Sequence, residues 1–337
     1  MLIDALEAQV GCIFVVDNGS AADVSTAFPS DSKAELEFII NTDNLGIAAA
    51  QNQGAARALA RSDCRFVVLS DQDSFPAPHM VRLLRQALED YGGGGFGAVL
   101  DASRPPFGGT LGPVAAAGPW SVDMRSGERA SLVADPTFWS TSRLRRPSES
   151  SAATPLPPFE VGFLIASGCL IPAQVLRQIG GMRSNYFIDH VDTEWCLRAR
   201  AAGFRLLVVP EAHLNHRLGD TVRRLWFLGS HHIAHHSPLR DYYMFRNTLF
   251  VLRDVRLAFS WRLRLLKRLI LFAVYFIALG SDRLARLRFM SLGLLHGMRS
   301  QSGRLNPSGN ALDTIPPNTL DPAVASADPL GADVNNT

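Results

Sequence analysis

The chain has 337 residues, of which 47% are hydrophobic and 19% charged, and its formal net charge is +2. This length and composition exclude a disordered chain and allow one large domain or two ordinary ones. The small net charge gives no argument for a nucleic-acid partner, and we expect none.

The N-terminal residues MLIDALEAQV lack the basic stretch and the long apolar core of a secretory signal. The four cysteines form no CxxC pair, and each lies in or beside an apolar run, which is typical of buried thiols in a reducing compartment. We therefore expect a cytoplasmic protein. The four are Cys12, Cys64, Cys169 and Cys196.

Short apolar runs and a helical segment make up the first part of the chain. Residues 11–16, 36–40 and 66–70 are apolar runs that predict strands. Residues 47–60 have high helix propensity and predict a helix between the second and third strands. This order predicts an α/β fold with a mostly parallel central sheet flanked by helices.

The segment 91–158 is rich in Gly, Pro and Ser and predicts long loops with short strands. After it, the apolar residues 161–167 and 205–210 predict two more strands. Helices are expected to begin near Pro172 and to cover residues 192–201, which are acidic and aromatic. A second structured block therefore follows the loops.

The composition changes again at 248–298, where basic residues far outnumber acidic ones. Its apolar run, residues 269–280, is shorter than the roughly 20 residues that span a bilayer. We expect a helix lying in the membrane interface, flanked by arginines, with Trp261 and Tyr275 near the headgroups. A buried helix packed on the preceding domain is the alternative. Residues 301–337 contain no aromatic residue and predict a disordered tail.

Two carboxylates follow the strand at 66–70, in the turn Asp71-Gln72-Asp73. In open α/β sheets, ligands bind at the carboxyl ends of strands. Oxygen ligands at this spacing suit Mg²⁺ or Mn²⁺, which would leave positions open for diphosphate oxygens. Surface turns also contain this pattern, so an ordinary turn is the alternative.

The first two strands end in polar turns as well. Asp17 ends the first strand, where its carboxylate would accept a hydrogen bond from a base or ribose. The second strand leads through Asn44 and Gly46 into a helix whose N-terminal amides would face a phosphate. A simple helix cap explains Asp43 or Asn44 equally well.

These motifs and their order along the chain resemble those of the inverting family 2 glycosyltransferases of the GT-A fold. One further segment, HHSPLRDYYMFRN, resembles the rhamnosyltransferase branch that builds O-antigen and other bacterial surface polysaccharides. The resemblance implies a nucleotide-diphosphate sugar donor, dTDP-L-rhamnose, and a lipid-linked or polysaccharide acceptor. The motifs in chain order are VVDNGS, NLGIAAAQNQGAARA, VVLSDQDS, IASGCLIP, FIDHVDTEWCLRARAAGFRLLVVP and HLNHRLGD.

The resemblance assigns roles to individual residues. It implies that Asp73 is a direct metal ligand, with His216 as a further one, although His216 as an ordinary loop histidine is an equal alternative. It implies that Asp192 is the base that takes the acceptor proton, with Val191 standing where the family has glutamate. Glu194 and Trp195 would shape the acceptor site. The donor-binding residues would be Asp17, Asn44, Gly46, Asp71, Gly168, Arg240 and Arg246.

Arg240 and Arg246 are assigned as phosphate contacts because guanidinium groups match phosphate oxygens. A histidine cluster precedes them and has the spacing of a zinc site, but no cysteine supports that assignment. We favour a loop or helix near the diphosphate or acceptor. The cluster is His231, His232, His235 and His236.

The motifs predict three parts: a GT-A domain at 1–247, a membrane-associating helical region at 248–300 and the tail. We expect the protein at the inner face of the cytoplasmic membrane. Family members carry one more strand before the helix that MLIDALEAQV matches, so we expect a start codon assigned too late. As alternatives to rhamnosyl transfer, the protein could be a hexosyl or galactofuranosyl transferase of the same fold, or an inactive, truncated, membrane-associated binding protein.

Overall fold

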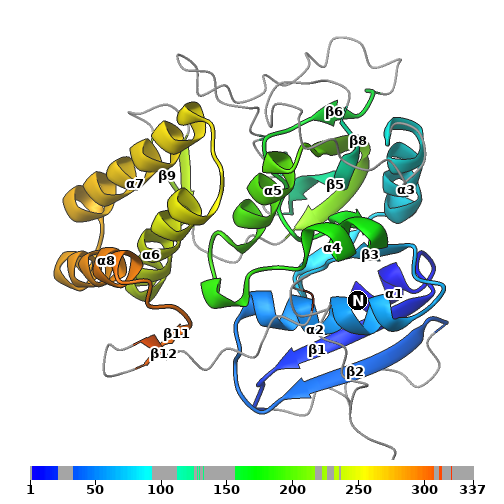
Figure 1. Cartoon of the computed structure of the whole chain (residues 1–337), viewed down its shortest axis with the longest axis horizontal. Coiled ribbons are helices and arrows are strands. Elements are labelled where there is room, and N and C mark those ends of the chain that lie inside the picture. The colour runs from blue at the N-terminus through cyan, green and yellow to red at the C-terminus, as the bar shows by residue number, and fades with distance from the viewer. Residues whose placement is uncertain are drawn as a thin grey trace, which may run out of the picture.

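The computed structural model is an α/β protein with a helical layer at one side (Figure 1). The residues that the structure describes are 2–21, 33–92, 112–124, 127, 129, 132, 156–216, 222–225, 231–234, 237–306, 311–312 and 320.

A two-stranded parallel sheet contains the first strands of the chain. β1 (Cys12–Asn18) pairs with β2 (Glu35–Asn41) in register from Cys12 opposite Glu35 to Asn18 opposite Asn41. The alanine-rich α2 (Ile47–Ala60) packs on β1, where the Cα of Gly54 lies close enough that a methyl group would meet the side chain of Val16 at 3.3 Å. The short α1 (Leu2–Leu6) precedes β1 and contacts β4 of the main sheet.

The main sheet has the strand order β3-β7-β5-β8-β4, and β6 pairs with β8. Only β5 and β8 pair in parallel here, so the expected mostly parallel pairing applies to β1–β2 and β5–β8, and the main sheet is mixed. The strands are β3 (Phe66–Val68), β4 (Ser74–Pro76), β5 (Val114–Asp123), β6 (Phe159–Glu160), β7 (Leu170–Pro172) and β8 (Arg205–His216).

Helices cover both faces of this sheet, and alternate residues of β8 contribute to the two cores. Leu206 and Val208 face the core formed with α5 (Val191–Ala201) and the end of α6 (Pro238–Asp254), while Leu207 and Val209 face α3 (Met80–Tyr91). All four side chains are buried. The helices are α3 (Met80–Tyr91), α4 (Ala173–Ile179) and α5 (Val191–Ala201), with a short 3-10 turn at Ser184–Tyr186.

Three helices form the layer at the left of Figure 1. They are α6 (Pro238–Asp254), α7 (Phe259–Leu279) and α8 (Arg283–Met298), and α6 contacts both others. In the described part of the chain, none of the helices has the length and apolarity needed to cross a membrane. Two antiparallel pairs of short strands lie before and after these helices in the sequence. They are β9 (Val222–Leu225) with β10 (His231–Ala234), and β11 (Arg304–Leu305) with β12 (Ala311–Leu312).

Three sequence expectations differ from the structure. Residues 161–167 are not a strand; they are irregular, and Val161 and Leu164 are buried in the core. The loop-rich segment 91–158 contains β5, a buried ten-residue strand at the centre of the sheet. The Leu305 side chain is buried and its backbone N–H bonds to Tyr243, so the start of the expected disordered tail is ordered.

Trp261 is also placed differently from the expectation. Only 2% of its surface is exposed, and it packs in the main core rather than facing outward. Tyr275 is half-buried against Phe276. The expected boundary after residue 247 falls inside α6, and most of the tail, together with His235 and His236, lies outside the described residues.

Candidate active site

The carboxyl ends of β3, β5 and β8 lie at one edge of the main sheet. The backbone of His216, the last residue of β8, is opposite Ser74 on one side and Asp123 on the other. Asp73 directly precedes Ser74, so the register brings Asp73, Asp123 and His216 to the same edge. Asp123 is not among the residues predicted from the sequence, because it lies in the segment expected to be loops.

The Asp71-Gln72-Asp73 turn is held by the segment before β7. The Asp71 backbone N–H donates to Ser167 Oγ at 3.1 Å, and the hydroxyls of Ser167 and Ser74 are 2.6 Å apart. The Gly168 backbone N–H donates to the Leu69 carbonyl at 2.7 Å. The turn therefore keeps a fixed position although both carboxylates are only half-buried.

Gly168, which we assigned to donor binding, has an evident structural role. Its φ is +78°, a conformation that side chains disfavour. A Cβ atom here would lie 2.7 Å from Pro119 and 3.0 Å from Leu214. The glycine therefore lets three chain segments meet behind the acidic turn.

A network of asparagine side chains joins the ends of β1 and β2. Asn18 Oδ1 accepts a hydrogen bond from the Leu45 N–H at 3.0 Å, and Asn18 Nδ2 donates one to Asn44 Oδ1 at 3.1 Å. Asn44 accepts from the Gly46 N–H at 2.9 Å, as expected of a turn that opens a helix. Asp17 is 7% exposed and accepts from the Ser20 N–H at 2.9 Å, so its carboxylate also shapes the turn after β1.

The N-terminus of α2 contacts the loop that precedes α5. The Ile47 N–H donates to the Phe187 carbonyl at 2.8 Å, and Gly46 is so close to Phe187 that no Cβ would fit. One turn further, the buried Asn52 exchanges two hydrogen bonds with the Met182 backbone, at 2.7 and 2.8 Å. Asn52 was not selected from the sequence, although it lies in a motif that carries the resemblance.

The loop before α5 has an unusual backbone. Phe187, Asp189 and His190 have positive φ angles of 63°, 62° and 60°. Each such non-glycine residue costs about 1–3 kcal/mol and persists only where the surroundings hold it. The polar contacts made by α6 supply that support.

Arg246 and Asn247 of α6 bind the carbonyl groups of this loop. Arg246 is fully buried and donates to the carbonyls of Tyr186, Asn185 and Gly303 at 3.0, 3.3 and 2.6 Å. Asn247 donates to Tyr186, Ile188 and Asp189 at 2.7–2.9 Å. Backbone carbonyls therefore occupy the Arg246 guanidinium in this structure, and its assignment as a donor-phosphate contact stays a prediction.

Arg240 lies in the same helix and is more exposed to solvent than Arg246. It pairs with Asp189, with Nη2 to Oδ1 at 2.6 Å and Nε to Oδ2 at 3.3 Å. A bidentate pair of this kind fixes both side chains. About a third of the Arg240 side chain remains exposed, at 36%.

Asp192 lies in the first turn of α5, next to the loop. Burial raises the pKa of its carboxyl, opposed by hydrogen bonds from the Thr193 backbone and hydroxyl. Asp192 also contributes to the raised pKa of Cys169, after burial and Cys196.

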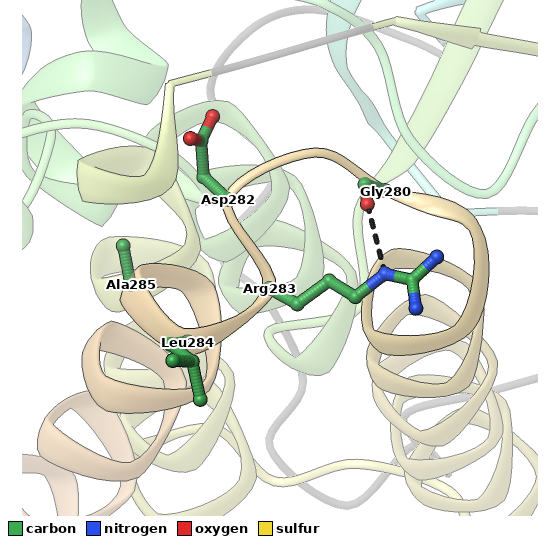
Figure 2. Close-up of a pocket in the computed structure, with 5 residues that line it drawn as sticks. All are labelled: Gly280, Asp282, Arg283, Leu284 and Ala285. Atoms are coloured by element: carbon green, nitrogen blue, oxygen red, sulfur yellow. Dashed lines mark hydrogen bonds between the residues drawn. The ribbon is translucent and has the colours of Figure 1, made fainter.

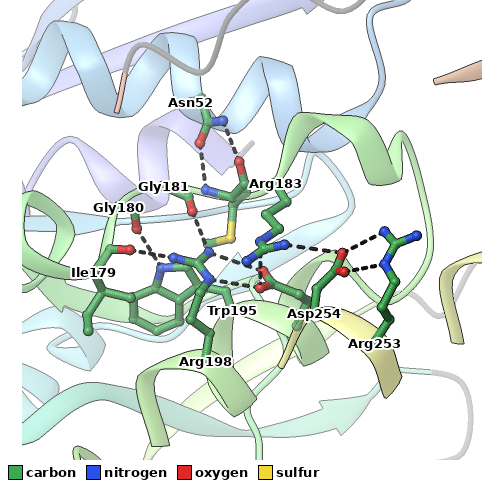
Figure 3. Close-up of polar contacts among 11 residues, drawn as sticks. Asn52, Ile179, Gly180, Gly181, Arg183, Trp195, Arg198, Arg253 and Asp254 are labelled. Atoms are coloured by element: carbon green, nitrogen blue, oxygen red, sulfur yellow. Dashed lines mark hydrogen bonds and ion pairs between the residues drawn. The ribbon is translucent and has the colours of Figure 1, made fainter. Parts of the chain in front are cut away.

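The expected acceptor residues Glu194 and Trp195 make their contacts inside the fold, and Figure 3 shows those of Trp195. Glu194 is fully buried and pairs with Arg198 at 2.8 Å and Arg183 at 3.0 Å. Trp195 is 1% exposed and donates from its ring nitrogen to the Gly180 carbonyl at 2.9 Å. Neither side chain is exposed in this structure, so direct contact with an acceptor is not available to either, and their assignment to the acceptor site stays a prediction.

The residues at the sheet edge have the donor chemistry of a Mg²⁺ or Mn²⁺ site. Asp71 and Asp73 provide carboxylate oxygens, and Asp123 lies across the register. No cluster of three or more such side chains occurs among the described residues, and the His216 side chain lies outside them. The fit therefore rests on the two carboxylates of the turn.

Known proteins are similar to part of this sequence, and others are similar to its fold. Residues 3–140 match the family described as Glycosyl transferase family 2. A stretch of 146 residues is 30% identical to the dTDP-rhamnosyl transferase RfbF of Shigella flexneri, covering 43% of this chain and 48% of that protein. The match thus spans about half the length of this relative.

Two solved structures of S. aureus TarS are similar in fold at 12% identity. One has a TM-score of 0.53 and covers 89% of this chain and 46% of that chain. The other, TarS 1-349 in complex with UDP-GlcNAc, has a TM-score of 0.50 and covers 88% of this chain and 76% of that chain.

Proposed function

We propose that this chain, a family 2 glycosyltransferase of the GT-A fold, transfers a sugar from a nucleotide diphosphate to an acceptor hydroxyl with inversion. We propose L-rhamnose carried on dTDP as the donor, supported by the likeness to a protein named as a dTDP-rhamnosyl transferase. A lipid-linked or polysaccharide acceptor, in the synthesis of a bacterial surface polysaccharide such as O-antigen, is part of the proposal and rests on the sequence resemblance.

The position and pKa of Asp192 carry the proposal for the chemistry. Inverting transfer needs a base that takes the acceptor proton while the hydroxyl attacks the anomeric carbon. A carboxylate whose pKa is raised by burial is a stronger base than an exposed one. Asp192 has this environment, at the start of a helix whose preceding loop is tied to α2 and α6.

In this proposal, the acidic turn Asp71-Gln72-Asp73 acts on the leaving nucleotide diphosphate. We propose that Asp71 and Asp73 hold Mg²⁺ or Mn²⁺, with His216 as a further ligand. The metal would neutralise charge on the departing diphosphate. Ser167 keeps the turn in place through its bonds to Asp71 and Ser74. Asp17, Asn44 and Gly46 are proposed to contact the nucleotide at the ends of β1 and β2.

A donor panel with an Asp192 variant tests the proposal. Purified chain is incubated with Mn²⁺ and dTDP-rhamnose, a UDP-hexose or UDP-galactofuranose, and nucleotide release is measured with and without saccharide acceptors. We expect Asp192→Asn to lower turnover by about a hundredfold or more while nucleotide binding persists. Asp63→Asn, which changes an exposed carboxylate, is the matched control.

Three results would contradict different parts of the proposal. Equal turnover by wild type and Asp192→Asn would refute the base assignment. Failure to bind or turn over any nucleotide sugar would instead favour a binding protein without transferase activity. Turnover that survives chelation of divalent metal would refute the role given to Asp71 and Asp73.

A further inference from the structure

Helix α7 has apolar side chains on two opposite faces. Its inner face packs on the protein through Trp261, Leu265, Leu269 and Phe276, all of them buried. A surface helix needs only one apolar face to pack in this way. The second face therefore requires another explanation.

The outer face of α7 is a continuous apolar stripe. Its members recur every three or four residues, which places them on one side of the helix. Their exposed fractions lie between 38% and 65%. They are Phe259, Leu263, Leu266, Ile270, Val274 and Ile277.

Helix α8 repeats this arrangement. Gly293 and Gly297 face α6 so closely that a Cβ would lie 2.4 Å from the Tyr242 carbonyl and 2.7 Å from Leu249. This close packing fixes which face of α8 points outward. The outward side chains are 36–85% exposed and again recur at helical spacing: Leu284, Leu287, Leu295 and Met298.

We call the apolar stripes of α7 and α8 together the outer apolar face. Both helices lie at the left edge of Figure 1, on the side away from the sheets. Their turn contains an open pocket of about 490 Å³ lined by Gly280, Asp282, Arg283, Leu284 and Ala285 (Figure 2). Arg283 donates to the Gly280 carbonyl at 3.3 Å beside it.

Basic side chains accompany the outer apolar face. Neither α7 nor α8 contains an acidic residue. On helical spacing, Arg262 and Lys267 flank the stripe of α7, and Arg288 flanks that of α8; all three are exposed. Exposed apolar side chains between cations match an anionic lipid surface, where the chains enter the interface and the cations meet phosphates.

We infer that the outer apolar face binds an anionic phospholipid surface, with α7 and α8 lying in the interface. A second copy of the chain is a poorer occupant, because it would bring the same basic rim against this one and like charges oppose the contact. The inference stands on the helices alone and does not depend on the proposed sugar transfer.

Vesicle sedimentation with the full chain tests this inference without any sugar substrate. We expect binding to phosphatidylglycerol-containing vesicles to exceed binding to pure phosphatidylcholine by about tenfold and to weaken with salt. The variant Ile270→Asp/Val274→Asp should lose about tenfold in binding with an unchanged thermal unfolding transition, because both side chains are exposed. Tyr91→Ser, at an exposed aromatic residue of α3, is the matched control.

Several outcomes would overturn the inference. One is equal or absent binding to the two kinds of vesicle. Another is a dimer in light scattering that the α7 variant dissociates, which would assign the outer apolar face to a second copy. Failure to bind vesicles together with normal transferase activity would refute the surface and leave the proposed function intact.

Discussion

Replacing Arg246 by methionine tests whether this residue clamps the loop before α5 or binds donor phosphate. Methionine keeps most of the apolar length and removes five hydrogen bonds, to Asn247, Tyr242, Gly303, Asn185 and Tyr186. After the change the Tyr186 carbonyl still accepts from Asn247, and the Asn185 carbonyl from the Gly303 N–H. The Gly303 carbonyl loses its 2.6 Å donor.

The expected loss of stability in Arg246→Met follows from these contacts. Each hydrogen bond to a charged group contributes about 1.5–3 kcal/mol, and an orphaned buried acceptor costs about 1–3 kcal/mol. Removing a buried guanidinium, whose pKa is already lowered by burial, offsets part of this loss. We expect the free energy of unfolding to fall by about 3 kcal/mol, which moves the urea midpoint by about 1 M at an m-value of about 3 kcal/mol/M.

Two assays separate the roles. Urea unfolding followed by fluorescence gives the stability, and titration with dTDP or UDP gives nucleotide affinity. As a loop clamp, Arg246→Met lowers stability and turnover but leaves nucleotide affinity within about threefold. Unchanged stability with nucleotide binding weakened at least tenfold would refute the clamp and restore the phosphate contact. Arg85→Met, on the exposed side of α3, controls for loss of an arginine.

Two further predictions concern buried positions. Burial lowers the pKa of His190 to about 4. The neutral imidazole therefore contributes about 3 kcal/mol to the free energy of unfolding above the unfolded-state pKa of about 6.5, and this contribution is lost as the pH falls towards 4. Urea unfolding across this pH range should show the loss, and stability curves of the same shape for wild type and His190→Asn would contradict it. Gly168→Ala should lower stability by about 2–3 kcal/mol because its methyl meets Pro119. Gly127→Ala, with a φ of +67° and open space, should cost about 1 kcal/mol in the same thermal unfolding assay; equal losses would contradict the packing argument.

The sequence located the helix that carries the candidate base, α5, within one residue, and also the start of β8. The start of β8 was found because Leu206 to Val209 form a continuous apolar run, and all four are buried. It missed β5, whose Ala115, Ala116 and Ala117 are fully buried but have low strand propensity. Apolarity of 161–167 correctly indicated burial and wrongly indicated a strand.

Three residues predicted to bind substrate make their contacts inside the fold instead, and the three cases have a common physical cause. Glu194, Trp195 and Arg246 have the residue types that bind sugars and phosphates, but each satisfies groups of its own fold. A sequence shows the chemistry of a side chain and not which partners burial gives it. Asn52 was overlooked for the same reason, since its partners at Met182 lie far away in the chain.

The hydrogen bond between Arg246 and the Gly303 carbonyl bears on where the proposed catalytic unit ends. Gly303 follows α8, and the adjacent Leu305 bonds to Tyr243 of α6. A fragment cut after α6 would contain every proposed reactive residue and still lack one of the carbonyls that hold the loop clamp. Deletion series and domain swaps should therefore place the joint beyond residue 306, and loss-of-function substitutions are to be expected on the buried side of α8, far from any sugar.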